Sequence, residues 1–230
     1  MTSEIIYRII SVLIGYVLGN FTMGYFLGKM NNVDLRKEGS GNVGMTNTMR
    51  TLGVKAGIIT FAVDFIKAVL AMFIVYFIFR SRVDFIGLYM VYAGVGAILG
   101  HDFTIFLNFK GGKGIATSAG LVAIMFPKIF FISLAIFLIT VLISRYVSLG
   151  SLLGSISYGV LVVIFGELGW LSVPSIEWLT YPREYMAEIY FIMLFATALA
   201  IFQHRENIAR LVKHEERKVS FSKSKKKNVD

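Results

Sequence analysis

The sequence predicts an all-α integral membrane protein, a bundle of seven transmembrane helices with its N-terminus outside and its C-terminus in the cytoplasm. Three observations lead to this fold class. Hydrophobic residues make up 56% of the 230 residues and charged residues only 16%, whereas a soluble protein carries about 25% charged residues. The apolar residues lie in long runs, and a span needs roughly 20 of them to cross the bilayer. Basic residues gather on one side of these runs, as they do in membrane proteins.

Seven apolar runs are separated by short polar segments. The N-terminus lacks a basic region and a cleavage site, so the first run is expected to stay as a helix. The fourth run is short for a crossing, and we expect it to tilt, to break or to lie in a thinned bilayer. Trp170, Trp178 and Tyr181 are expected at the outer interface. The expected spans are residues 5–27, 58–79, 85–100, 115–126, 129–144, 149–171 and 186–202.

Basic residues decide the predicted orientation. Loops on one side hold Lys29, Arg36, Lys37, Arg50, Lys55, Lys110, Lys113 and Arg145, together with the C-terminal residues. Loops on the other side hold Arg80, Arg82, Lys128 and Arg183. Because Lys and Arg accumulate in cytoplasmic loops, the richer side is predicted to be cytoplasmic. We expect one membrane domain, residues 1–214, and a basic, disordered cytoplasmic tail, residues 215–230.

The first polar segment on the cytoplasmic side, residues 28–57, is rich in glycine and in hydrogen-bond donors. Glycines let backbone N–H groups turn toward one point and form a concavity that holds an anion. An arginine adds a planar fork suited to phosphate. The alternative is a glycine-rich turn at the interface without a ligand. The candidate phosphate-binding residues are Gly39, Ser40, Gly41, Asn42, Gly44, Thr46, Asn47 and Arg50.

The second polar segment, residues 101–114, leads directly into a predicted helix. A helix N-terminus offers unpaired N–H groups and favours an anion. The segment is not a Walker A loop, because Leu107 stands at the position of the first glycine and Gly114 at that of the Ser or Thr. In the alternative, the lysines of this segment only help to set the orientation of the chain in the membrane. The candidate residues are His101, Gly111, Gly112, Lys113, Gly114 and Thr117.

The third polar segment, residues 203–214, places His204 and Asn207 on one face if it is helical. The alternative is a solvated interfacial histidine.

Inside the second span, Asp64 and Lys67 are three residues apart and can pair with each other. We expect this pair because unpaired charges in the bilayer cost free energy. The chain has no cysteine, which excludes disulfides and thiolate metal sites. The acidic residues near the three segments are isolated, so neither a metal nor a cofactor is expected.

The ordered set of segments resembles a known family. The strings are Gly39-Ser40-Gly41-Asn42 with Thr46, Asn47 and Arg50; Gly100-His101 with Phe109-Lys110-Gly111-Gly112-Lys113-Gly114; and His204-Arg205-Glu206-Asn207-Ile208. They resemble the three cytoplasmic motifs of the PlsY family, the bacterial acyl-phosphate:glycerol-3-phosphate acyltransferases. The resemblance covers nearly the whole chain, including the number of spans and the order of the motifs. The chain departs from the family pattern at Thr22 and Thr104, where proline is common.

The resemblance implies transfer of a fatty acyl group from acyl phosphate to the sn-1 hydroxyl of glycerol-3-phosphate. It implies that Ser40, Arg50 and Lys113 hold phosphates and that His204 and Asn207 position the glycerol and stabilise an oxyanion, with Glu206 among the substrate-binding residues. Whether His204 is also a general base is left open. The implied location is the bacterial inner membrane, with the site at the cytoplasmic face.

The implied partners are the two substrates and membrane lipid, with no nucleic acid. A functional coupling to the enzyme that forms acyl phosphate is left open.

Acyltransferases of the His-x-x-x-x-Asp class are excluded, because no histidine has an aspartate five positions on. The alternative function is an organophosphate or anion transporter. Such a site would lie near the midplane on broken helices, whereas the charged residues here gather at one face.

Overall fold

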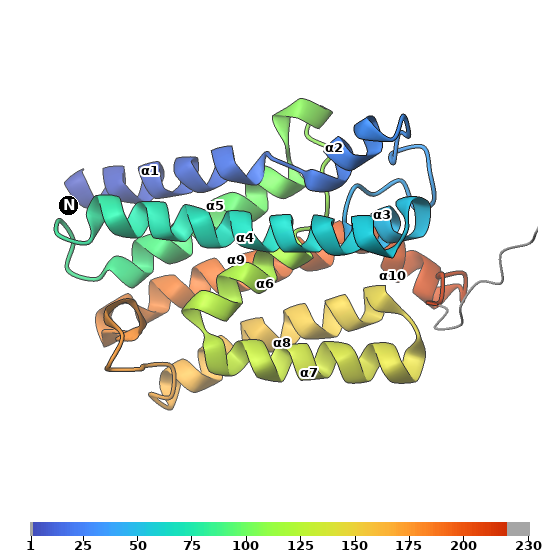
Figure 1. The fold of residues 1–230 in the computed structure, drawn as a ribbon. Helices are drawn as coiled ribbons and strands as arrows, with labels where there is room; N and C mark the ends of the chain where they lie inside the picture. Colours follow the sequence, from blue (N-terminus) through green and yellow to red (C-terminus); the bar gives the residue numbers. More distant parts are fainter. Residues whose placement is uncertain (1, 220–230) are drawn as a thin grey trace, which may run out of the picture.

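The computed structural model describes residues 2–219, and every regular element in this range is a helix (Figure 1). The α-helices are α1 (Thr2–Gly19), α2 (Met23–Met30), α3 (Met45–Leu52), α4 (Val54–Phe79), α5 (Ile86–Asp102), α6 (Ile115–Met125), α7 (Pro127–Ser144), α8 (Val147–Glu167), α9 (Met186–Gln203) and α10 (Arg205–Val212). Short 3₁₀ turns are η1 (Ile105–Leu107), η2 (Glu177–Leu179) and η3 (Arg183–Tyr185). The long helices lie side by side, with the start of α1 at one end of the bundle and α10 at the other.

The expected membrane-protein class is confirmed, but seven full crossings are not. Within the described residues, six helical stretches are long and apolar enough to span a bilayer: Ser3–Met30, Val54–Phe79, Ile86–Leu107, Pro127–Ser144, Val147–Glu167 and Arg183–Gln203. The expected fourth span is α6, with only 11 residues. At 1.5 Å per residue it is roughly 16 Å long, about half of the hydrocarbon thickness. The first span is itself divided between α1 and α2.

Helix α5 forms the centre of the bundle. Of its residues only Tyr92 and Leu99 are not fully buried, and it packs against α1, α4, α6 and α9. Its contact with α1 is close because Gly96 and Gly100 lie against the backbone of α1, where a side chain would collide with main-chain atoms. Small residues allow membrane helices to approach in this way. This packing places the end of α5, which carries His101 and Asp102, beside the polar segments.

One end of the bundle, here called the aromatic end, consists of residues 168–185 packed against the α6–α7 junction. The Tyr181 hydroxyl donates a hydrogen bond to the Met125 carbonyl, and the Tyr181 ring stacks on Phe126 with 5.6 Å between centroids. Tyr181 is only 9% exposed. Because α6 ends early, this loop fills the space that a longer helix would occupy. Tyr181 therefore packs inside the end of the bundle, whereas the aromatic composition of the loop suggested a residue at the membrane interface.

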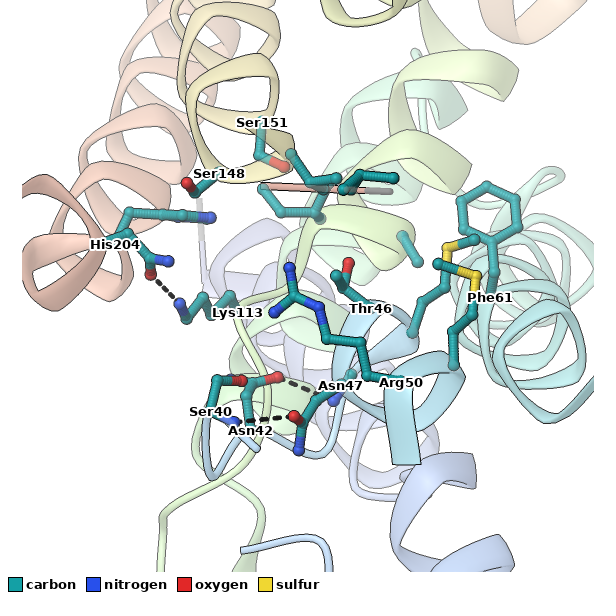
Figure 2. A pocket seen from close by; sticks show the side chains of 18 of the residues that line it. Ser40, Asn42, Thr46, Asn47, Arg50, Phe61, Lys113, Ser148, Ser151 and His204 are labelled. Carbon is teal, nitrogen blue, oxygen red and sulfur yellow. Dashed lines mark hydrogen bonds between the residues drawn. The ribbon is translucent and has the colours of Figure 1, made fainter. Parts of the chain in front are cut away.

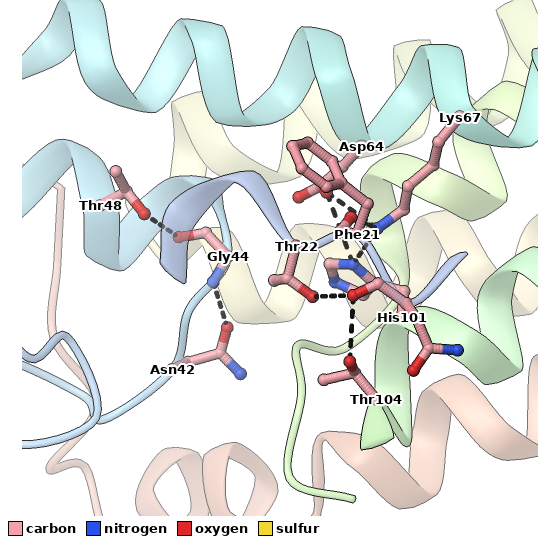
Figure 3. Close-up of polar contacts among 10 residues, drawn as sticks. Phe21, Thr22, Asn42, Gly44, Thr48, Asp64, Lys67, His101 and Thr104 are labelled. Carbon is pink, nitrogen blue, oxygen red and sulfur yellow. Dashed lines mark hydrogen bonds and ion pairs between the residues drawn. The ribbon is translucent and has the colours of Figure 1, made fainter. Parts of the chain in front are cut away.

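The opposite end, here called the motif end, holds the three polar segments. The break between α1 and α2 is tied to the end of α5 there. The Asn20 carbonyl accepts hydrogen bonds from the hydroxyls of Thr104, at 3.0 Å, and Thr22, at 3.3 Å, as Figure 3 shows for the two threonines. The Asn20 amide oxygen accepts the N–H of Ile105 at 2.7 Å. These bonds satisfy polar groups that the break exposes, which buried backbone requires.

Candidate active site

A cavity of about 600 Å³ opens at the motif end (Figure 2). Its walls come from all three polar segments, from α7 and α8, and from residues that follow α10. Parts of the chain more than 150 residues apart therefore meet in one place. The candidate residues that line it are Gly39, Ser40, Asn42, Gly44, Thr46, Asn47, Arg50, His101, Lys113, Gly114, His204 and Asn207.

Asn47 holds the first glycine loop in shape. Its amide oxygen accepts the N–H of Ser40 at 2.8 Å, and its amide nitrogen donates to the carbonyls of Glu38, at 2.9 Å, and Leu35, at 3.2 Å. Gly39 has a left-handed φ of 60°, and a side chain there would collide with the Asn47 amide. The Asn47 amide is thus used within the loop. Its role is to present the neighbouring groups to the cavity.

Two of the candidate cationic side chains reach the cavity from different segments. Figure 2 shows Arg50 extending from α3 and Lys113 from the loop before α6. The Lys113 ammonium donates a hydrogen bond to the Asn207 amide oxygen of α10. The pKa of Lys113 is lowered to about 8, mainly by burial and also by the nearby Arg210 charge. A bound anion would reverse this effect, because an opposite charge favours the ammonium form.

His204 lies at the end of α9 and is buried beside Lys113. Burial lowers the pKa of His204 to about 4, and the Lys113 charge acts in the same direction. The imidazole is therefore neutral near pH 7. Its Nδ1 is 2.8 Å from the Ala200 carbonyl, which can only accept a hydrogen bond, so Nδ1 carries the proton. Nε2 is left with a free lone pair that can accept a hydrogen bond from a hydroxyl group.

A buried cluster behind the cavity joins α4 to α5 (Figure 3). The Lys67 ammonium donates to Asp64 at 2.9 Å, to the Phe21 carbonyl at 2.9 Å and to His101 Nδ1 at 2.7 Å. An ammonium has three donors, so all of them are used. The expected Asp64–Lys67 pair is present, and His101 is its third partner. Asp64 and His101 also line the cavity.

All three polar segments of the site match a known protein family. A family model described as glycerol-3-phosphate acyltransferase matches residues 9–214. The chain belongs to this family. The expected resemblance to PlsY is thereby confirmed, and the match includes all three polar segments.

Relatives and solved structures agree over nearly the full length. A glycerol-3-phosphate acyltransferase from Thermoanaerobacter sp. (strain X514) is 37% identical over 214 residues, which cover 93% of this chain and 96% of the relative. One from Clostridioides difficile (strain 630) is 36% identical, covering 96% and 99%. The crystal structure of the integral membrane enzyme PlsY in its glycerol 3-phosphate form has a TM-score of 0.77 and 34% identity, covering 93% and 96%. Its lysophosphatidic acid form has a TM-score of 0.75 and 33% identity.

Several candidate residues of this PlsY-family chain do not line the cavity. Gly111 and Gly112 donate their N–H groups to the carbonyls of Asp102, at 2.9 Å, and His101, at 3.1 Å, so these donors are used by the backbone instead of facing a phosphate. Thr117 is buried in α6. Glu206 is exposed on α10. Gly41 has a φ of 72° and faces the Arg36 carbonyl, which gives it a place in the loop turn.

The cavity also includes residues that sequence reasoning missed. Ser148 and Ser151 reach it from the first turns of α8, and Arg210 from α10. Glu216 lies in the stretch assigned to the tail, yet it contacts Asn207 and Arg210. Its signal in the sequence is an acidic residue within a basic stretch. Residues 220–230, the rest of the expected tail, lie outside the described residues.

Proposed function

We propose that the protein transfers a fatty acyl group from acyl phosphate to the sn-1 hydroxyl of glycerol-3-phosphate, giving lysophosphatidic acid and phosphate. One observation carries the proposal: a single cavity has cationic and polar groups at one side and an apolar wall at the other. That combination suits a phosphate head on a fatty chain. Family membership supports the acceptor, since the relatives are named glycerol-3-phosphate acyltransferases.

The polar side would hold the phosphate groups. Ser40, Arg50 and Lys113 lie around the cavity, and among the described residues neither cation has a carboxylate within 4 Å. Charge-assisted hydrogen bonds to phosphate are roughly twice as strong as neutral ones. A dianionic substrate therefore supplies the negative charge that these side chains lack.

The apolar side would hold the fatty chain. Leu134, Phe137 and Val141 of α7 line the main cavity. A second, apolar cavity of about 130 Å³ shares Leu134 and Phe137 with it and continues between α6, α7 and α8 as far as Tyr158. Burial of each CH₂ group contributes about 0.8 kcal/mol. An acyl chain placed there would leave its carbonyl beside the polar groups.

The reaction then needs position more than a strong base. The sn-1 oxygen forms a bond to the acyl carbonyl carbon, the bond from that carbon to the phosphate oxygen breaks, and the hydroxyl proton leaves with the phosphate. His204 would accept the hydroxyl hydrogen bond at Nε2 and orient the attacking oxygen. Its pKa of about 4 makes it a weak base, which supports proton transfer to the departing phosphate. Asn207 would complete the positioning of the glycerol.

Orientation and location follow from the same proposal. The motif end would face the cytoplasm of a bacterial cell, because its loops hold most of the basic residues. The N-terminus would lie outside. Since the chain has no cysteine, variants such as Lys110→Cys and Arg82→Cys can each be labelled at one site. In right-side-out vesicles an impermeant reagent should label only Arg82→Cys, and labelling of Lys110→Cys alone would reverse the orientation.

The deciding experiment uses the purified full-length protein in lipid nanodiscs with palmitoyl phosphate. Phosphate release should depend on glycerol-3-phosphate, and lysophosphatidic acid should appear in equal amount. Palmitoyl-CoA in place of palmitoyl phosphate tests the acyl donor. Formation of lysophosphatidic acid with palmitoyl-CoA but not with palmitoyl phosphate would refute acyl phosphate as the donor. Flux of glycerol-3-phosphate into proteoliposomes without any acylation would instead identify a transporter.

A further inference from the structure

The five residues 215–219, here called the strap, follow α10 and return across the cavity. The Val219 N–H donates to the Arg145 carbonyl at 2.8 Å. The Arg50 guanidinium approaches the Arg217 carbonyl at 3.4 Å. Glu216, Arg217 and Val219 line the cavity itself. The strap lies beyond residue 214, where the match to the family model ends.

Glu216 places its carboxylate among the groups of the candidate site. One carboxylate oxygen accepts hydrogen bonds from the Ser148 hydroxyl, at 2.8 Å, and from the Asn207 amide, at 2.7 Å. The other accepts from the Arg210 guanidinium at 2.7 Å. The Glu216 side chain is only 8% exposed. This is a well-satisfied anion, held by three donors of the cavity wall.

The charge state of Glu216 agrees with this geometry. Burial alone would raise the pKa of Glu216, but hydrogen bonds from Arg210, Ser148 and Asn207 outweigh it, and the pKa is lowered. The carboxylate is therefore ionised near pH 7. The Asn207 amide links it to Lys113, because the same amide donates to Glu216 and accepts from the Lys113 ammonium. Glu216 thus completes a chain of contacts from the strap to the proposed phosphate site.

We propose that the strap is an autoinhibitory segment, in which the Glu216 carboxylate occupies the Asn207 and Arg210 donors next to the phosphate-binding Lys113 and must withdraw before the anionic substrate binds. The inference rests on the proposed function. Two anions cannot share one set of donors, because like charges at contact distance repel strongly. Glycerol-3-phosphate and the strap therefore compete for the Asn207 amide and the Arg210 guanidinium.

Competition by a tethered group has a simple measurable effect. If the strap is docked about 90% of the time, the apparent affinity for the phosphate substrate is lowered about tenfold. Release of the strap removes this factor without changing the chemistry of the bound state. The inhibitory role is thus opposite in sign to a positioning role, in which loss of Glu216 would misplace Asn207 and weaken activity.

The kinetic test compares Glu216→Gln with Glu215→Gln in the full-length protein. Both variants remove one negative charge from neighbouring residues, but the exposed Glu215 is outside the cavity wall. Glu216→Gln should lower KM for glycerol-3-phosphate about tenfold with kcat unchanged, and Glu215→Gln should match the wild type. A lower kcat or a higher KM in Glu216→Gln would overturn the proposal. Equal effects of the two variants would indicate a general effect of charge and would also overturn the proposal.

A binding measurement separates this inference from the proposed function. Calorimetric titration with inorganic phosphate needs no turnover, and Glu216→Gln should bind it more tightly than the wild type. If Glu216→Gln binds phosphate more tightly but the protein performs no acylation, the inhibitory role of the strap is supported and the proposed reaction is refuted. Unchanged or weaker binding by a protein that acylates glycerol-3-phosphate would refute the strap and keep the reaction.

Movement of the strap gives a readout that does not depend on Glu216 itself. In the naturally cysteine-free chain, Lys218→Cys places a thiol on the strap and Lys213→Cys places one at the end of α10. Saturating inorganic phosphate should speed maleimide labelling at position 218 and leave position 213 unchanged. Labelling at 218 that is unaffected or slowed by phosphate would contradict the proposal.

Discussion

The two ends of the bundle differ in whether particular cationic side chains have an acidic partner. At or next to the aromatic end, two arginines are paired with acids: Arg8 lies 2.7 Å from Glu188, and Arg183 lies 3.0 Å from Glu167. At the motif end, Arg210 lies 2.7 Å from Glu216, but the cavity-lining Arg50 and Lys113 have no carboxylate within 4 Å among the described residues. Unsatisfied cations are unfavourable unless a ligand provides the missing charge. The comparison separates an end that stabilises the bundle from an end prepared for an anion.

The packing of the two ends differs in the same sense. Rings fill the aromatic end, where Trp178 packs edge-on against Phe73 and Tyr76 at 5.7 and 5.2 Å between centroids. The motif end is built from glycine loops that leave a cavity of about 600 Å³. Filled interiors contribute stability through contacts, whereas a cavity forfeits them. Variants at the two ends should accordingly affect different properties.

The largest effect on stability is expected from Asp64→Asn, behind the cavity. The side chains of Asp64 and Lys67 are only 2% and 5% exposed, so the variant leaves a buried ammonium without its counter-charge. Breaking such a pair lowers the free energy of unfolding by about 3–5 kcal/mol. Glu188→Gln, in the more exposed Arg8–Glu188 pair next to the aromatic end, should lower the free energy of unfolding less. Thermal unfolding in detergent measures both, and an equal loss would contradict the distinction.

The largest effect on activity is expected from Lys113→Met. Removing a positioned cation that binds developing or transferred charge lowers kcat/KM about 100-fold or more. Lys110→Met is the matched control, because Lys110 is exposed in the same loop and outside the cavity wall. Acylation should collapse in the first variant and stay near the wild-type rate in the second. Similar rates in both would show that Lys113 is only a topogenic charge.

The pH profile should report the same ammonium. The pKa of Lys113 is about 8 before substrate binds, and only the protonated form attracts phosphate. As pH rises through this value, kcat/KM for glycerol-3-phosphate should fall about tenfold per pH unit. Lys113→Arg keeps its charge, so its profile should stay flat to about pH 10 even if its rate is lower. A wild-type profile that is flat above pH 8 would exclude this role.

The smallest effect is expected from Tyr181→Phe at the aromatic end. The variant removes the hydroxyl that donates to the Met125 carbonyl and keeps the ring that stacks on Phe126. Loss of one hydrogen bond should lower the free energy of unfolding by about 1 kcal/mol. Activity per folded molecule should not change, because the group is remote from the cavity. A fall in kcat with unchanged thermal stability would show that the two ends are coupled.

The segments that form the cavity can be predicted from the sequence, but the contacts within them cannot. The spacing of Asp64 and Lys67 predicted their pair, since residues three apart share a helix face, but His101 joins from another helix. The glycines around Lys113 predicted a phosphate cradle, yet two of them donate to the end of α5. Asn47 was a candidate ligand that lines the cavity, and its amide also holds its own loop in shape. In each case the contacting residue is too far away in the sequence for a short motif to predict the contact.

The sequence by itself determined the membrane class, most of the helices, and the concentration of glycine and positive charge at one end. These properties depend on local composition and on the length of apolar runs, which the bilayer constrains directly. Only the tertiary structure decided that α6 stops at 11 residues and that Tyr181 closes the space beyond it. It alone placed Glu216 on Asn207 and Arg210. Such contacts depend on how distant helices pack, so the three-dimensional arrangement was needed to find them.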